Sequence, residues 1–101
     1  MKRYDIKADK EWSMLGGTGR SQTATMVLTP GETTGGPENR HRESDQWMYV
    51  LSGNGEAVVA GQHTPLLEKT LLLIEAGEAH EIKNTGAVAL RTLNFYAPEE
   101  Y

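Results

Sequence analysis

Asn39-Arg-His-Arg-Glu-Ser-Asp-Gln46 and Gly77-Glu-Ala-His-Glu-Ile-Lys-Asn84 are the two stretches that decide the fold of this chain. Two of its three histidines lie in them, among polar residues whose side chains can bind a metal ion. The first stretch runs directly into Trp47–Leu51, which has the composition of a β-strand. We therefore expect short strands to bring imidazole, carboxamide and carboxylate groups together in one site.

Composition limits the kind of protein this is. The 101 residues suffice for one compact domain, covering 1–101, and the formal charge of −4 argues against a nucleic-acid partner. There is no cysteine, so disulfides and thiolate ligands are excluded. No run approaches the ~20 apolar residues of a membrane span, and the N-terminal residues lack the apolar core of a signal peptide. We expect a soluble, cytoplasmic protein that binds neither nucleic acid nor membranes.

Frequent turn signals separate short runs, and no segment keeps a helical period, which predicts an antiparallel all-β fold. Asn54-Gly55 is the sharpest hairpin signal. The segment before about Arg20 has no readable pattern. The expected strands are 22–28, 40–43, 46–51, 56–60, 70–74, 80–84 and 89–96.

The alternation of side chains along a strand predicts which residues face the interior. If His80 points inward, Ile82 and Asn84 do so too, and Glu81 and Lys83 face water. His41 and Gln46 are an odd number of residues apart, so a turn or bulge between them should place them on adjacent strands.

The strand that starts at Gln46 has an apolar outer face. With Gln46, Met48 and Val50 inward, the residues that face outward are Trp47, Tyr49 and Leu51. Such a face needs a cover, either the N-terminal segment or another subunit. We expect a homodimer.

The residues themselves leave two interpretations of the site open. In one, His41 and His80 donate nitrogen to a metal, Gln46 adds a weaker carboxamide oxygen, and Glu43 restores the missing charge. In the other, Gln46 and Asn39 form a buried polar network that binds no metal. His63, the third histidine, is expected in an exposed turn.

Two motifs of the chain resemble those of the cupin family. Cupins carry Gly, then His-x-His, three or four residues, Glu, six residues and Gly; their second motif is Pro-x-Gly-x-x-His-x-x-x-Asn. The second motif matches at Gly77, His80 and Asn84, with Glu75 where proline is usual. The resemblance covers about residues 22–98 and implies a single antiparallel cupin β-barrel, also called a double-stranded β-helix or jelly roll.

The first motif fits in two registers. Counting back from Gly53 places Gln46 at the Glu position, His41 at the second His and Asn39 at the first. We prefer this register, because the strand that ends at Gly53 then needs no deletion.

Counting forward from Gly35 instead places His41 at the first His and Glu43 at the second, and leaves the gap to Gln46 one residue short. In both registers the resemblance implies that His41, Gln46 and His80 are metal ligands. The possible fourth ligand is Asn39 in one register and Glu43 in the other.

The resemblance implies a divalent cofactor (Fe, Mn, Ni or Zn) and an enzyme of dioxygenase, isomerase or decarboxylase type acting on a small organic molecule. Glu43 and Tyr96 are the candidates for a general acid or base. Cupins also include modules without catalytic activity, so the alternative is a small-ligand or sugar-binding protein, with or without a metal.

Overall fold

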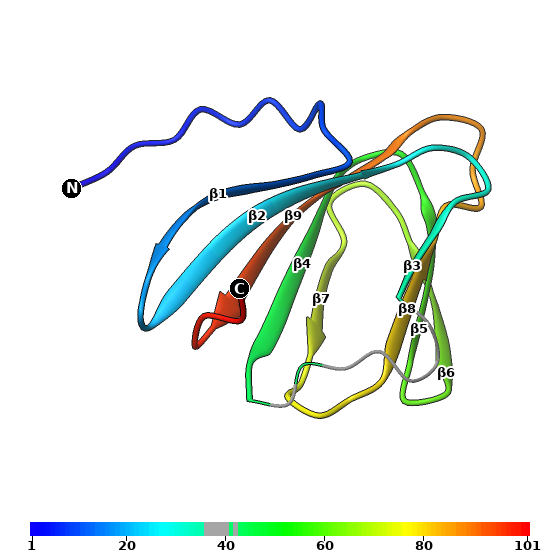
Figure 1. Ribbon diagram of the computed structural model, residues 1–101. Coiled ribbons are helices and arrows are strands. Elements are labelled where there is room, and N and C mark those ends of the chain that lie inside the picture. Colours follow the sequence, from blue (N-terminus) through cyan, green and yellow to red (C-terminus); the bar gives the residue numbers. More distant parts are fainter. Residues whose placement is uncertain (36–40, 42) are drawn as a thin grey trace.

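The computed structural model describes residues 1–35, 41 and 43–101 (Figure 1). In this part of the chain the secondary structure is entirely β, with nine strands. Their bounds are β1 (Trp12–Thr18), β2 (Ser21–Leu28), β3 (Thr33–Gly35), β4 (Asp45–Ser52), β5 (Gly55–Val59), β6 (Gln62–Leu66), β7 (Leu71–Ile74), β8 (His80–Lys83) and β9 (Leu90–Ala97). The described residues include no helix that could span a membrane.

The strands form two antiparallel sheets that face each other. The larger sheet has the order β1-β2-β9-β4-β7 and the smaller one the order β3-β8-β5-β6. Figure 1 shows the larger sheet opposite the smaller one, with the chain crossing between them at both ends. This is the all-β jelly-roll arrangement expected from the sequence.

Most predicted strands are present within one or two residues of their expected bounds, and three observed strands were not predicted. The pattern of β1 is broken by a bulge between Met14 and Gly16. β3 has only three residues, and β6, an edge strand, contains Pro65. Each of these features hides the period-two alternation that identifies a strand.

The expected strand 40–43 needs correction. His41 and Glu43 lie outside any strand, and the other two residues of this range are outside the described residues. His41 therefore precedes β4 on the same segment, so the prediction that His41 and Gln46 lie on adjacent strands was wrong. The backbone of His41 is bonded to a loop instead, because Gly77 N donates to His41 O over 2.6 Å.

The predicted side-chain directions are correct on both sheets. Inward residues of β4 and β8 are buried, while Trp47 is 41% exposed. The hydrophobic core between the sheets consists of Met26, Leu28, Met48, Val50, Ala57, Leu66, Ile82 and Leu90. It occupies one end of the space between the sheets, and the inward row at the other end of the larger sheet is polar.

That polar row crosses three strands in register. Gln22 of β2 lies opposite Tyr96 of β9, and Tyr96 lies opposite Gln46 of β4. All three side chains are buried. Because strand pairing aligns them on one inner face, residues distant in sequence form a single polar surface at the mouth of the barrel.

Gly53 closes the turn between β4 and β5. Its φ is +82°, and a Cβ there would lie 2.3 Å from the carbonyl oxygen of Ala89. Both features require glycine, which explains its place at the end of the first motif.

Candidate metal and ligand site

The two buried histidines meet between the sheets. His41 lies just before β4, and His80 is the first residue of β8, where it pairs with Val59. Their ring centroids are 4.9 Å apart and both residues are buried. Gln46, the second residue of β4, completes the group, so the structure brings together the three side chains that the sequence nominated.

Both ring nitrogens of His41 have partners. Nε2 lies 2.9 Å from Oε1 of Gln46, and Nδ1 lies 3.1 Å from a carboxylate oxygen of Glu100. The motif predicted that His41 and Gln46 converge, though not that they contact each other directly. The Glu100 contact was not expected, because nothing in the pattern around residue 100 marks it as part of a site.

The orientation of the Gln46 amide follows from a chain of hydrogen bonds. The carbonyl oxygen of Ala24 can only accept, so the Asn94 amide donates to it, over 3.4 Å, and also to Thr92 Oγ1, over 3.1 Å. Asn94 Oδ1 is then the acceptor for Gln46 Nε2, at 3.2 Å. Gln46 therefore points its oxygen, and not its nitrogen, at His41.

His80 has a defined tautomer. Its Nδ1 lies 3.2 Å from the backbone oxygen of Glu78, which can only accept, so Nδ1 carries the proton. Burial lowers the pKa of His80, and the neighbouring His41 lowers it further, while the Glu78 carbonyl opposes them. The neutral ring then has its lone pair on Nε2 and lines a cavity of about 90 Å³ between the sheets.

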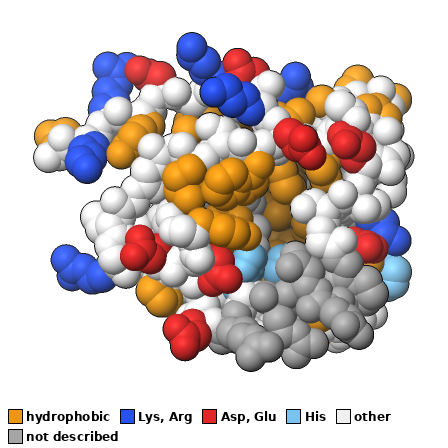
Figure 2. Space-filling model, viewed as in Figure 1, with side chains coloured by type: hydrophobic (Ala, Val, Ile, Leu, Met, Phe, Trp, Pro, Cys, Tyr) orange, Lys and Arg blue, Asp and Glu red, His pale blue; other side chains and the backbone are white. Residues whose placement is uncertain are grey.

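Aromatic side chains form one wall of this cavity. The ring of Tyr101 lies 5.2 Å from Tyr96, 5.2 Å from Trp12 and 5.9 Å from His41, measured between centroids. Figure 2 shows hydrophobic side chains gathered at the centre of this face, beside a histidine side chain. Burial, followed by the neighbouring Tyr101, raises the pKa of Tyr96, so this candidate acid–base residue keeps its proton and does not act as a phenolate base.

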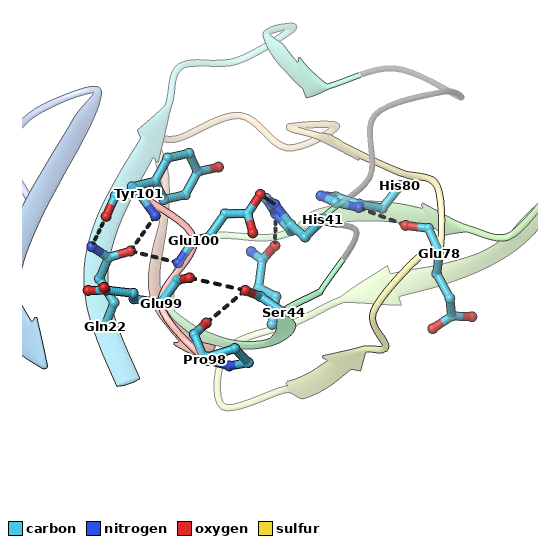
Figure 3. Close-up of polar contacts among 10 residues, drawn as sticks. Gln22, His41, Ser44, Glu78, His80, Pro98, Glu99, Glu100 and Tyr101 are labelled. Atoms are coloured by element: carbon cyan, nitrogen blue, oxygen red, sulfur yellow. Dashed lines mark hydrogen bonds and ion pairs between the residues drawn. The ribbon is translucent and has the colours of Figure 1, made fainter. Parts of the chain in front are cut away.

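The C-terminal segment 98–101 closes the site from the side of the larger sheet. Gln22 binds it at both ends of its amide: Nε2 donates to Tyr101 O over 2.6 Å, and Oε1 accepts from Glu100 N and Tyr101 N over 3.2 and 2.8 Å (Figure 3). Ser44 Oγ donates to Pro98 O over 2.7 Å. These bonds to the backbone fix the place where the side chains of the segment enter the site.

Other residues considered from the sequence lie elsewhere. Asn39 is outside the described residues, and Glu43 is exposed and does not line the cavity. Asn84 is structural, because its amide donates to the backbone oxygens of Leu28 and Val88. His63 is exposed, as predicted, but lies on β6 and not in a turn.

The site can be tested for its fit to a metal ion. Atoms at adjacent corners of an octahedron with bonds of about 2.1 Å lie about 3.0 Å apart. His41 Nε2 and Gln46 Oε1 are 2.9 Å apart, and His80, whose Nε2 is left without the ring proton, lines the same cavity. Within the described residues no three His, Cys, Asp or Glu side chains form a metal cluster, which reflects the carboxamide at position 46. The donors present therefore fit a divalent ion held by nitrogen and neutral oxygen.

The fold and the buried histidine pair define a double-stranded β-helix with a polar site at its mouth. The chain belongs to the cupin family, whose model, described as Cupin domain, matches residues 24–96.

Three similar proteins illustrate the range of the family. The chain is 30% identical over 73 residues to the tetracenomycin polyketide synthase protein TcmJ of Streptomyces glaucescens, covering 72% of this chain and 48% of that protein. It is 31% identical over 70 residues to the oxalate-binding protein of Thermotoga maritima, covering 69% of this chain and 56% of that protein. The crystal structure of BH2720 from Bacillus halodurans matches with a TM-score of 0.85 at 25% identity, covering 90% of this chain and 72% of that one. The chain spans about half the length of the two curated relatives.

Proposed function

We propose that this protein binds a divalent metal ion through His41, Gln46 and His80, and uses it to hold a small chelating organic molecule that the protein converts. The tautomer of His80 is the observation that carries the proposal. Histidines that bind metals usually donate their second ring N–H to a carbonyl or carboxylate, which leaves the other nitrogen free to coordinate. His80 is held in this way by Glu78 O.

The remaining residues of the site shape what can bind. Gln46 presents its oxygen because Asn94 holds its nitrogen. Tyr96, Tyr101 and Trp12 exclude water from one side of the cavity, and Tyr96 keeps a proton that it can donate to a ligand oxygen. A bound divalent ion would supply Lewis acidity and a template for two neighbouring ligand oxygens.

The ligand is expected to be small. A cavity of about 90 Å³ is far below the size that accommodates a drug-sized molecule. Enols, hydroxy acids and dicarboxylates combine small size with two adjacent oxygens. The name of the Thermotoga maritima relative, an oxalate-binding protein, supports this class.

Metal binding is tested by elemental analysis of protein purified without chelators or a nickel column. We expect about one divalent ion per chain, lost on His80→Ala, because this variant removes one of only two imidazoles. His63→Ala is the matched control, since the Glu56 carboxylate is the only hydrogen-bond or ion-pair partner of this exposed histidine among the described residues. Equal metal content in wild type and His80→Ala would refute the site.

Ligand binding is tested on the chelator-treated protein, reloaded with Fe(II), Mn(II), Ni(II) or Zn(II). Calorimetric titration with oxalate or a simple hydroxy acid should give heat only when the ion is present. Binding of the same strength without the ion would show that the ligand does not need it.

A second candidate is a metal-free ligand-binding module. It is favoured by the hydrogen bonding around the site, since no side-chain nitrogen or oxygen of the described residues that is fully shut off from solvent lacks a partner. In this case His41, Gln46 and Asn94 form a permanent network. Elemental analysis distinguishes the candidates, because the network requires no metal.

A further inference from the structure

Glu100 is the one carboxylate that faces a site histidine among the described residues. Its oxygen lies 3.1 Å from His41 Nδ1, and its side chain is 26% exposed against 7% for His41. The residue follows β9, far along the chain from the histidine that it contacts. Figure 3 shows the Glu100 side chain extending from the C-terminal segment toward His41.

The position of Glu100 does not depend on this ion pair. Gln22 accepts the backbone N–H groups of Glu100 and Tyr101, and Ser44 holds the backbone of Pro98. The carboxylate can therefore be neutralised by substitution while the segment remains attached to β2.

The hydrogen-bond directions give Glu100 a specific effect on His41. A carboxylate can only accept, so it favours a proton on Nδ1 of His41. In a neutral ring the lone pair then lies on Nε2 and faces Gln46 Oε1, which is also an acceptor because Asn94 fixes the amide. Two acceptors 2.9 Å apart need a cation, either a proton or a metal ion, between them.

We propose that Glu100 is a positioning residue for the metal site. Its carboxylate holds the proton of His41 on Nδ1, so that Nε2 and Gln46 Oε1 together accept a divalent cation, and it supplies the negative charge that a carboxamide at position 46 lacks. This inference rests on the proposed metal function. It gives the C-terminal segment a role in metal binding, although this segment lies outside the two histidine motifs.

The test compares Glu100→Gln with Glu99→Gln in the full chain. Both substitutions remove one negative charge, but the Glu99 side chain has no hydrogen-bond or ion-pair partner among the described residues, and Ser44 contacts only its backbone oxygen. Calorimetric titration of chelator-treated protein with Zn²⁺ should show at least about tenfold weaker binding for Glu100→Gln, the size usual for such supporting groups. Glu99→Gln should bind as wild type does.

A spectroscopic readout separates positioning from a general loss of structure. Long-range ¹H–¹⁵N spectra of the histidine rings should show the His41 proton on Nδ1 in the zinc-loaded wild type, with its signal shifted or broadened in Glu100→Gln. Glu100→Asp, which keeps the charge, should recover part of the affinity. Such a recovery of Zn²⁺ affinity in Glu100→Asp would also exclude unfolding as the cause of the weaker binding by Glu100→Gln.

The outcomes distinguish the two proposals. If the wild type binds Zn²⁺ and Glu100→Gln binds it equally well, the role of Glu100 is refuted and the metal site stands. If the wild type binds no metal, both are refuted.

Discussion

Gln46 stands where cupins usually carry glutamate, and its surroundings show what the carboxamide does. Its nitrogen donates to Asn94 Oδ1 over 3.2 Å, while its oxygen faces His41. A carboxylate has no hydrogen to donate, so it would place an oxygen against Asn94 Oδ1. Asn94 cannot reverse its amide without losing its bond to Ala24 O, which can only accept.

This geometry predicts opposite effects of Gln46→Glu on stability and on affinity. The metal-free variant should be less stable by about 1 to 3 kcal/mol, the cost of a buried polar group without its partner. Its affinity for a divalent ion should rise at least about tenfold, which requires only about 1.4 kcal/mol from the added charge. Denaturant unfolding with chelator measures the first effect and calorimetric titration the second.

Gln62→Glu is the matched control, because Gln62 is exposed on β6. Gln62→Glu should change neither the free energy of unfolding nor the affinity for the divalent ion appreciably. Equal or weaker metal binding by Gln46→Glu would mean that Gln46 does not contact the ion, and the metal-free network would then be the better account.

His80 makes the stability of the metal-free protein depend on pH. Burial lowers its pKa in the folded state below the ordinary 6.5, so the unfolded chain takes up a proton first as the pH falls. The stabilisation that neutral His80 gives the folded state is complete above pH 6.5. It decreases as the pH falls below 6.5, until the pH has passed the lower pKa of the folded state. Between about pH 7.5 and about pH 5, the free energy of unfolding of wild type should fall more than that of His80→Gln. Parallel curves for the two proteins, measured with chelator, would contradict this.

At the level of residues, the sequence predicted the parts of the site that follow from alternation within one strand. Gln46 and His80 face inward for that reason. Asn94 and Glu100 could not be predicted in the same way, because their positions depend on the pairing of β9 with β2 and β4. That register is a property of the assembled sheet.

At the level of elements, the strands with an uninterrupted apolar pattern were predictable, and three of the four edge strands, β1, β3 and β6, were not. β2, β4 and β9 lie next to one another in the larger sheet, and each buries alternate residues. β1 and β6 lie at sheet edges and carry a bulge and a proline respectively. Edge strands tolerate such interruptions because one side has no partner strand.

The C-terminal segment is the element whose attachment can be tested separately. Gln22→Ala removes the three hydrogen bonds that tie Glu100 and Tyr101 to β2. Each bond contributes about 1 kcal/mol, so amide exchange at these two residues should accelerate at least about tenfold. The affinity of Gln22→Ala for Zn²⁺ should also fall if Glu100 supports the site.

Hydrogen-exchange mass spectrometry of the C-terminal peptide measures this effect. Exchange in the β4 and β9 peptides should stay slow, since Gln22→Ala leaves their backbone pairing intact. Unchanged exchange at residues 100 and 101 would show that the aromatic contacts of Tyr101 suffice to hold the segment.

At the level of the whole molecule, the outer face of the larger sheet remains largely apolar. Trp47 lies opposite Leu73 on one side and Phe95 on the other, and these side chains are 41%, 38% and 42% exposed. The N-terminal segment covers only a neighbouring part of the sheet, where Arg91 Nε donates to Ala8 O over 3.1 Å. A continuous row of three large apolar side chains across adjacent strands is typical of a protein interface.

We propose that a second copy of the chain covers this row, so that the protein is a homodimer at micromolar concentration. Trp47→Glu should then give monomers, because a charge at the centre of an apolar interface cannot be desolvated without a partner. Val88→Glu is the control, since Val88 is 61% exposed in the loop before β9, away from the row. Light scattering coupled to size-exclusion chromatography should give twice the chain mass of 11.1 kDa for wild type and Val88→Glu, and the chain mass itself for Trp47→Glu. A monomeric wild type would refute the interface and leave the exposed row without an explanation in terms of self-association.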